Sequence, residues 1–267
     1  MQYNKLLIRV RSGQADVLWG CMPVRLLLLG GLIYLGIIIC VPIANALPTN
    51  PPTIITDLSW PNCADTTVTD WTIGIVGVNG GLDFHPNDCL YNESKLFSAY
   101  ALYFNTGYPG PSYAQKFSSN PLKCSVTDEL CLAYNYGYNA ARYSITYADL
   151  QSVHAFMWWL DVEISNSWTS NGLQNRAVLI GMIAALKKYT FLPTIGFYSS
   201  PEQWDSITAG WTNDFPVWVA TGTASLKVAI SFCENENFTG GSTWLTQYTT
   251  DLDHNYVCGS YAQNLMP

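Results

Sequence analysis

Two carboxylates stand two residues apart at the end of an apolar run in this chain of 267 residues. Residues 155 to 168 read AFMWWLDVEISNSW, with the acids at Asp161 and Glu163. Side chains two apart on a strand point to the same face, so Trp159, Asp161 and Glu163 would share one wall. Two acids in an aromatic, poorly hydrated wall do not both ionise easily, so one pKa rises and that group can act as a general acid near neutral pH. This is the chemistry that glycoside hydrolysis requires.

The same triplet has a simpler interpretation, in which Asp161 caps the following helix and Glu163 makes an ordinary ion pair. The rest of the chain therefore has to decide between the two. Polar residues recur where other apolar runs end, at Asp57, Ser59, Asn79, Asn105, Thr106, Ser199, Thr221 and Gln247. In barrels of parallel strands, catalytic groups lie at the carboxyl ends of the strands.

Eight short apolar runs are the strand candidates that would position these residues: 54–60, 71–81, 99–107, 156–163, 194–200, 215–222, 227–233 and 242–248. Apolar residues at helical spacing predict a helix over 175–189, with lysines in its last turn, and a second helix around 129–148. Strands that are apolar on both faces and separated by helices favour a parallel sheet covered by helices. No Gly-rich nucleotide loop follows the first strand, so we expect an α/β fold, a single and somewhat irregular (β/α)8-type TIM barrel with disulfides.

Composition excludes several classes of protein. The chain is 49% hydrophobic and only 12% charged, which argues against disorder. Its formal net charge of -7 gives no electrostatic footprint for nucleic acid. We therefore expect a globular domain with no nucleic-acid partner.

Residues 1–46 have the pattern of a targeting segment. Four basic residues, Lys5, Arg9, Arg11 and Arg25, precede an apolar stretch over 26–43, and the small-residue sequence ANA follows. A signal peptide cleaved after Ala46 and an uncleaved signal anchor both fit this pattern. Either way we expect export to the cell exterior or the cell wall, with membrane attachment only through an uncleaved leader. A Pro-rich linker over 47–53 then leads into one domain over 54–267.

Six cysteines follow this leader, and an even number in an exported chain indicates disulfides, although six cysteines allow 15 pairings. We favour pairing between sequence neighbours, which gives Cys63 with Cys89, Cys124 with Cys131, and Cys233 with Cys258. No CxxC pair or histidine cluster accompanies them, so no metal and no cofactor is expected.

Several ordered stretches carry a resemblance to a known family. TDLSW, WWLDVE, TIGFYSS, VWVATG, WLTQY and DLDHNYVC occur in that order and resemble glycoside hydrolase family 25, the muramidase-type lysozymes. Within this superfamily the chain is most similar to secreted bacterial glycoside-hydrolase-like domains of unknown function. The resemblance covers about residues 54–258.

The resemblance implies a role for each acid. Glu163 matches the general acid and Asp161 its partner in the D-x-E motif, while Asp57 and Asp253 match the acids of the first strand and of the barrel's end. The implied substrate is peptidoglycan or a related N-acetylated glycan, cut at β-1,4 bonds. The second strand reads VGVNGG where the family carries a charged motif. This difference favours an alternative, a non-catalytic barrel that binds cell-wall glycan.

Aromatic and amide side chains supply candidate substrate contacts. Sugar rings present apolar faces that stack on aromatic side chains. The candidates are Trp159, Tyr198, Trp218, Trp244, Gln247 and Asn79. Taken singly, such aromatics are more often simply buried, and Trp159 stands out because it would share a strand face with the carboxylates.

Overall fold

A computed structural model describes residues 6–12, 15–24, 37–43, 53–63, 71–235, 237–261 and 264. The chain divides into two compact units, Met1–Pro51 and Pro52–Pro267. The first unit holds a three-stranded antiparallel sheet of β1 (Leu6–Ser12), β2 (Ala15–Val24) and β3 (Ile37–Ile43). This sheet lies within the sequence of the predicted leader, whose cleavage or anchoring stays a prediction. Residues 47–52 of the predicted linker lie outside the described residues.

The second unit is a closed barrel of eight strands in the order β10-β11-β4-β5-β6-β7-β8-β9. In chain order these strands are β4 (Ile54–Leu58), β5 (Trp71–Gly77), β6 (Phe97–Asn105), β7 (Met157–Asp161), β8 (Thr194–Ser199), β9 (Val217–Ala220), β10 (Thr243–Thr249) and β11 (Asp253–Val257). Neighbours from β4 through to β10 pair in parallel. The expected α/β barrel with disulfides is therefore confirmed.

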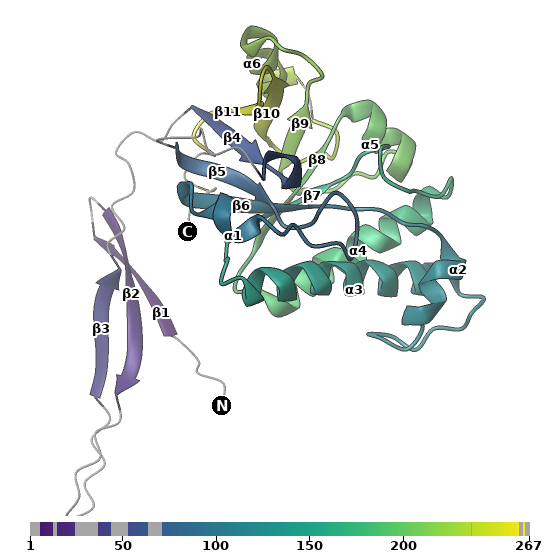
Figure 1. The fold of residues 1–267 in the computed structure, drawn as a ribbon, viewed down its shortest axis with the longest axis horizontal. Coiled ribbons are helices and arrows are strands. Elements are labelled where there is room, and N and C mark those ends of the chain that lie inside the picture. The colour runs from purple at the N-terminus through teal and green to yellow at the C-terminus, as the bar shows by residue number, and fades with distance from the viewer. Residues whose placement is uncertain are drawn as a thin grey trace, which may run out of the picture. The chain divides into compact units, whose positions relative to one another are not determined.

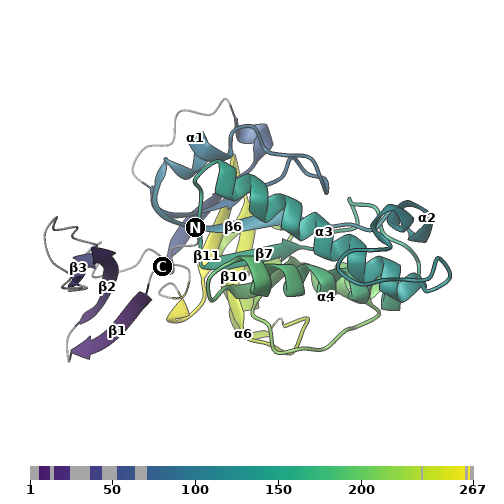
Figure 2. The ribbon, with the colours of Figure 1, turned by 90° about the horizontal axis from the view of Figure 1, so that it is seen from below.

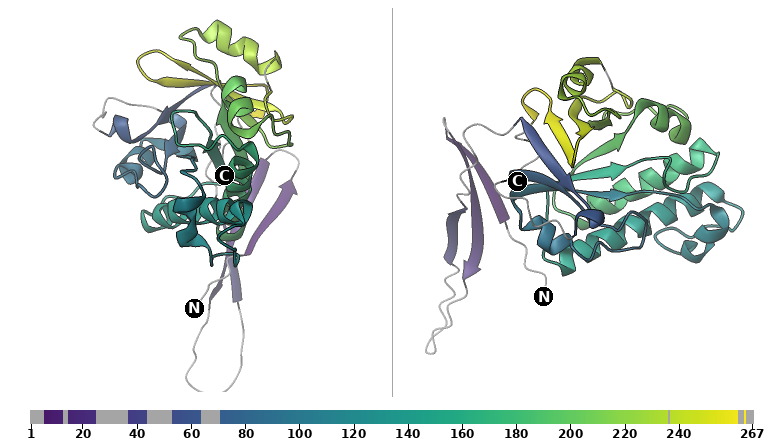
Figure 3. Two further views of the ribbon diagram at one scale, coloured as in Figure 1. Left: turned by 90° about the vertical axis from the view of Figure 1, so that its right-hand side faces the viewer. Right: turned by 45° about the horizontal axis from the view of Figure 1, so that its top comes forward.

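The irregularity of the barrel lies at β11, which pairs antiparallel with both β10 and β4. Figure 3 (right) shows these last, yellow strands beside the blue strand β4, where the barrel closes. A tight turn between Thr249 and Asp253 forces this reversal, because a parallel return would need a long crossover connection. The first residue of β11 consequently lies at the same rim as the last residues of its neighbours.

The prediction of a strand over 227–233 is wrong, because these residues belong to helix α6 (Leu226–Asn235). The residues that turn inward are Ala229, which is fully buried, and Phe232 and Cys233, which are half-buried. Their spacing is helical, whereas the neighbouring Val228 and Ile230 are exposed. A short, continuous apolar run does not distinguish a strand from a helix. The eighth strand is β11 instead, which lies within the motif DLDHNYVC and was not predicted as a strand.

The remaining helices are α1 (Leu90–Ser94), α2 (Pro111–Ala114), α3 (Glu129–Leu150), α4 (Gly172–Tyr189) and α5 (Pro201–Thr208), with short 3-10 turns at Trp60–Asn62 and Gln115–Phe117. Both predicted helices are confirmed as α3 and α4, which lie side by side against one flank of the barrel (Figure 1; Figure 2). Glycines allow their close approach: a Cβ on Gly137 would lie 2.0 Å from the carbonyl oxygen of Val178, and one on Gly181 would lie 2.1 Å from that of Tyr134. Among the described residues, no helix combines the length and the apolar character needed to cross a membrane.

Two apolar cores hold the barrel unit together. The larger core lies between the strands and the helices, and a smaller one fills the barrel interior. All three predicted disulfides form, with Cα atoms 5.5 Å apart for Cys63–Cys89, 5.6 Å for Cys124–Cys131 and 5.5 Å for Cys233–Cys258. The last of these joins α6 to the residue after β11, so it fixes the helix beside the irregular closure.

Candidate active site at the carboxyl rim of the barrel

Four carboxylates come together at the carboxyl rim of the parallel strands. Asp57 lies near the end of β4, Asp161 ends β7, and Glu163 follows two residues later. Asp253 begins β11, and the reversed direction of that strand brings it to the same rim. These are the four acids singled out from the sequence, and no three of them are neighbours along the chain.

Asp57 is a buried acid held by amide groups. Asn255 donates a 2.8 Å hydrogen bond to its Oδ1, and Gln247 donates to Oδ1 at 3.2 Å and to Oδ2 at 3.1 Å. Burial raises the pKa of Asp57 to about 8, and the charge of Asp253 adds to the rise while the two amides oppose it. Trp218 in turn donates its indole N–H to Asn255 at 2.7 Å. The amides of Asn255 and Gln247 therefore hold the carboxylate of Asp57 in one orientation.

Asp161 is almost completely buried, with 3% of its surface exposed. Its Oδ2 accepts a hydrogen bond from Asn105, whereas its Oδ1 is buried without a hydrogen-bond partner. Burial raises the pKa of Asp161 well above its usual range, and the charges of Glu163 and Asp57 raise it further. An unpartnered buried carboxylate oxygen is costly, so this atom keeps a hydrogen-bonding capacity that no described side chain uses, and Asp161 itself lies behind the residues that line the cavity.

Glu163 is more open than Asp161 and faces a cavity. Burial raises the pKa of Glu163, the charge of Asp253 raises it further, and a hydrogen bond with Gln203 lowers it. Gln203 also accepts the backbone N–H of Ile164 at 2.7 Å, and Trp168 donates its indole N–H to the carbonyl of Glu163 at 2.9 Å. These contacts hold the segment that carries Glu163, so an acid with a raised pKa stands beside open space.

The simpler interpretation of the D-x-E triplet does not describe this structure. The helix after β7 is α4, and its N-cap is Asn171, whose side chain accepts the backbone N–H groups of Leu173 and Gln174. Glu163 forms no ion pair with any basic residue of the described part of the chain. The two acids therefore serve neither as a helix cap nor as half of an ion pair.

Tyr198 lies within the electrostatic reach of the four acids. It is the next-to-last residue of β8 and stands opposite Asp161 in the pairing of β7 with β8, and its hydroxyl donates to Gln247 Oε1 at 2.6 Å. Burial raises the pKa of Tyr198 first, and all four carboxylates raise it further through their charges. Tyr198 thus lies beside Asp161 in the sheet, and Gln247 connects its hydroxyl to the carboxylate of Asp57.

A cavity of about 450 Å³ opens next to Tyr198. Its lining residues come from the segments that follow β7, β8 and β9, from α5 and α6, and from β10: Glu163, Tyr198, Ser200, Pro201, Glu202, Gln203, Ala220, Thr221, Gly222, Phe232, Gln247 and Thr249. Three residues predicted for the site, Glu163, Tyr198 and Gln247, belong to this lining. Their position agrees with the rule that barrel sites form at the carboxyl ends of strands.

The three tryptophans proposed as sugar platforms lie outside the cavity lining: Trp159 and Trp218 fill the barrel interior, and the partly buried Trp244 packs against that core. Trp159 has no exposed surface and packs edge to face against Trp218 at 5.8 Å and Trp244 at 6.4 Å. Gly196, its partner on β8, leaves the space that the Trp159 ring occupies. Trp244 lies near the start of β10 and stacks on Tyr261. The rule that places Trp159 on the face of Asp161 holds, but that face points into a packed core.

Asn79 also lies outside the cavity lining, because it is buried and its amide is used for backbone contacts. It accepts the N–H of Asn105 at 2.9 Å and donates to the carbonyl of Asn105 at 2.8 Å. It is thus a support for the site rather than a contact for a substrate.

Three strand-end hydroxyls have a backbone role. Thr106 donates to the carbonyl of Asp161 at 2.6 Å, Ser199 to that of Val162 at 2.7 Å, and Thr221 to that of Gln247 at 2.5 Å. Each hydroxyl therefore fixes the backbone at the carboxyl end of a neighbouring strand. Some of the polar residues at strand ends are therefore candidates for the chemistry, and others hold the backbone that carries those candidates.

Two residues of the site, Asn255 and Gln203, were not predicted from the sequence. Asn255 stands two positions after Asp253, on the same face of β11, so the period of two could have indicated that it also points inward. His254, the residue between them, lies on the opposite face, with its ring 5.4 Å from that of Tyr248. Gln203 carries no comparable signal in the sequence.

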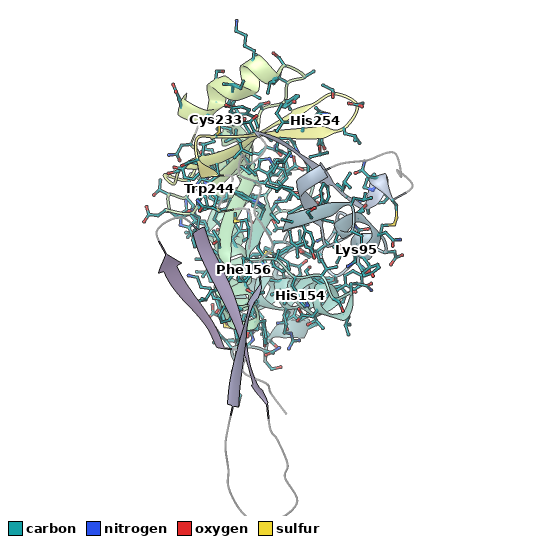
Figure 4. All side chains as sticks on the ribbon, turned by 90° about the vertical axis from the view of Figure 1, so that its left-hand side faces the viewer. Lys95, His154, Phe156, Cys233, Trp244 and His254 are labelled. Atoms are coloured by element: carbon teal, nitrogen blue, oxygen red, sulfur yellow. A yellow bond between two sulfur atoms is a disulfide. The ribbon has the colours of Figure 1, made fainter. Side chains whose placement is uncertain are left out.

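The residues described by the structure contain no group of three His, Cys, Asp or Glu side chains that could hold a metal ion. The histidines are also well separated, as the labelled His154 and His254 show in Figure 4.

A closed barrel with several buried acids at its carboxyl rim is the framework of a carboxylate-dependent glycoside hydrolase. Comparison with known proteins leads to the same class. A family model described as Lysozyme-like protein 1 matches residues 126–246. Probable GH family 25 lysozyme 4 of Dictyostelium discoideum is 26% identical over 156 residues, which cover 54% of this chain and 70% of that protein.

Probable GH family 25 lysozyme 2 of the same organism is 32% identical over 92 residues, 34% of this chain and 42% of that protein. The muramidase from Trichobolus zukalii superposes with a TM-score of 0.49 at 12% identity, covering 80% of this chain and 97% of that one. The sequence matches support a place for the chain in the superfamily of glycoside hydrolase family 25, the muramidase-type lysozymes. They also support a glycan-hydrolase function in general terms.

Proposed function

We propose that the protein is an exported glycosidase that hydrolyses β-1,4 bonds of peptidoglycan or a related N-acetylated glycan. The observation that carries this proposal is the gathering of four carboxylates within the electrostatic reach of Tyr198, at the wall of a cavity large enough for a sugar ring. Glycoside hydrolysis needs one carboxylic acid that keeps its proton near neutral pH and a second group that stabilises the anomeric centre. The rim provides both.

In this proposal Glu163 is the general acid. Its raised pKa keeps a proton available, and it transfers that proton to the glycosidic oxygen as the bond from this oxygen to the anomeric carbon breaks. The leaving sugar then departs as an alcohol. Gln203 steadies the segment that carries Glu163, which keeps the acid at one place beside the cavity.

Asp161 would act on the substrate's acetamido group. Its unpartnered Oδ1 accepts the acetamido N–H, which orients the acetamido oxygen for attack on the anomeric carbon. Water then adds to that carbon, the bond to the acetamido oxygen breaks, and the water's proton returns to Glu163. Protons and bonds balance over the two steps, so the net reaction is hydrolysis.

Substitution of the acid tests this function. Purified peptidoglycan and chitin oligomers are incubated with the wild-type protein and with Glu163→Gln, and new reducing ends are counted and identified by mass. We expect release by the wild type and at least a 100-fold loss in the variant, since general acid catalysis contributes about 10² to 10⁴. Glu234→Gln, the same change at an exposed position, is the matched control. Undiminished activity in Glu163→Gln would remove Glu163 from the mechanism.

Export rests on the leader pattern and is tested separately. The full chain is expressed in a host with a secretory pathway, and the intact mass of the exported form is measured. Loss of residues 1–46 supports a cleaved signal peptide, and their persistence in a membrane fraction supports an anchor. A chain found only inside the cell would contradict export.

A further inference from the structure

The carboxylate of Asp161 depends on a single side chain of the described molecule for hydrogen bonding. Asn105 Nδ2 donates to Asp161 Oδ2, and Oδ1 has no partner. Asn105 ends β6 and stands directly opposite Asp161 in the pairing of β6 with β7. The register of the sheet therefore places the amide of Asn105 next to the carboxylate of Asp161.

Asn105 is itself held by a second asparagine. The side chain of Asn79 accepts the backbone N–H of Asn105 at 2.9 Å and donates to its backbone carbonyl at 2.8 Å. These two bonds imitate the pairing of another strand at the point where β5 has already ended. Asn79 is buried, with 2% of its surface exposed, so water does not replace it in these bonds.

We infer that Asn105 is a positioning residue for Asp161, and that Asn79 supports it by fixing the backbone of Asn105. The inference rests on the proposed function, in which Asp161 Oδ1 receives the substrate's acetamido group. The hydrogen bond from Asn105 to Oδ2 restrains rotation of the carboxylate, so Oδ1 keeps the orientation that the proposed contact with the acetamido group requires. An amide donor also favours the ionised form of the acid, which is the form that accepts two hydrogen bonds.

The donor matters because the other surroundings of Asp161 oppose its charge. Burial and the negative charges of Glu163 and Asp57 raise its pKa. Two phenols from the neighbouring strands, Tyr103 and Tyr198, also lie within its electrostatic reach. None of these four groups is a cation, and within the part of the chain that the structure describes the amide of Asn105 is the group that favours the negative form.

Kinetics of Asn105→Ala give the first test. We expect kcat to fall about 100-fold while KM changes little, because a misplaced carboxylate affects the reacting geometry more than binding of the sugar chain. Asn79→Ala should give a smaller loss of the same kind, since it loosens the Asn105 backbone without removing the amide. An equal fall for an unrelated buried asparagine would overturn the inference.

Asn135→Ala provides that matched control. Asn135 is a fully buried asparagine on α3 whose amide donates to the carbonyl of Phe117 at 2.7 Å and to that of Leu122 at 2.8 Å. It lies outside the cavity lining. Its loss should lower stability while kcat per folded molecule stays within about twofold of the wild type, because remote sites act independently.

A measurement without turnover separates this inference from the proposed function. The carboxyl carbon of Asp161 is followed by NMR through a pH titration, assigned with Asp161→Asn. We expect its pKa to be higher in Asn105→Ala than in the wild type, and higher again in Asn105→Asp, which replaces the donor with a third acid. An unchanged pKa would overturn the role of Asn105 whether or not any glycan is cleaved. If the wild type cleaves none of the glycans while the pKa shifts as expected, the proposed function fails and the positioning contact stands.

Discussion

Asn255 donates a 2.8 Å hydrogen bond to Asp57 from β11, the one barrel strand that runs against both of its neighbours. A parallel strand would present its last residues at this rim, whereas β11 presents its first ones. The reversal brings Asp253 and Asn255 to the rim together, one as an acid and the other as a donor to an acid. The irregular closure of the barrel is therefore part of the site.

Replacement of Asn255 by leucine should destabilise the protein by about 2 to 4 kcal/mol. The change leaves the buried indole N–H of Trp218 without its acceptor, which costs about 1 to 3 kcal/mol. It also removes the shorter of the two hydrogen bonds to Asp57 Oδ1, which is worth about 1 kcal/mol. Urea unfolding measures the loss. Trp218→Phe keeps the bonds to Asp57 but removes the indole donor together with part of the ring. It should cost less if the hydrogen bonds dominate, and an equal or greater loss would show that ring packing dominates.

The pH dependence of hydrolysis should respond to Asp253. The general acid works in its protonated form, so activity falls as pH rises through the pKa of Glu163. The negative charge of Asp253 raises that pKa, and Asp253→Asn removes the charge. The alkaline limb of the kcat/KM profile should therefore move to lower pH in the variant.

Asp214→Asn, at an acid outside the cavity lining, is the control and should leave the limb where it is. A limb that stays in place in Asp253→Asn, or one that moves to higher pH, would exclude this electrostatic coupling.

Much of the barrel could be predicted because its strands carry local signals. Seven of the eight apolar runs are strands, and both predicted helices form. The prediction for 227–233 failed because its apolar residues, at 228–230 and 232–233, fit either type of element, and the burial of Ala229 in the folded chain decides. The strand β11 was missed as an element because its polar residues, Asp253, His254 and Asn255, mask the alternation that marks a strand.

The acids of the site could be found from the sequence, since carboxylates at the ends of apolar runs are unusual. Their partners could not, because hydrogen bonds such as those of Asn105 with Asp161 depend on strand register. The period of two on β7 correctly placed Trp159 with Asp161. It could not tell that both of these residues are buried and that the wall of the cavity begins only at Glu163.

Stability should fall as pH rises from about 4 to about 7, partly because of Asp83. Burial raises the pKa of Asp83 from 3.8 to about 7, and the hydroxyl of Tyr136 donates to its Oδ2 at 2.9 Å. Between these pH values the folded chain keeps a proton that the unfolded chain has released. Rising pH then favours the unfolded state until the folded group also titrates.

Urea unfolding of the wild type and of Asp83→Asn at several pH values checks this sign. The variant should show a smaller fall in unfolding free energy between about pH 4 and pH 7. Part of the fall should remain, because the pKa of Asp57 is raised to about 8 in the same direction. An identical pH dependence in both proteins would show that Asp83 binds no extra proton in the folded chain.

Removal of Cys233–Cys258 should cost more stability than removal of Cys124–Cys131. The first disulfide spans 25 residues and the second spans 7, and the chain-entropy relation gives roughly 3.5 and 2.4 kcal/mol for these lengths. The longer bridge also fixes α6, whose Phe232 lines the cavity, beside the end of β11. The two double Cys→Ser variants are compared by urea unfolding and by glycan hydrolysis per folded molecule. We expect reduced hydrolysis only in the variant that lacks Cys233–Cys258. A larger loss of unfolding free energy or of hydrolysis in the variant that lacks Cys124–Cys131 would mean that the short bridge supports the site.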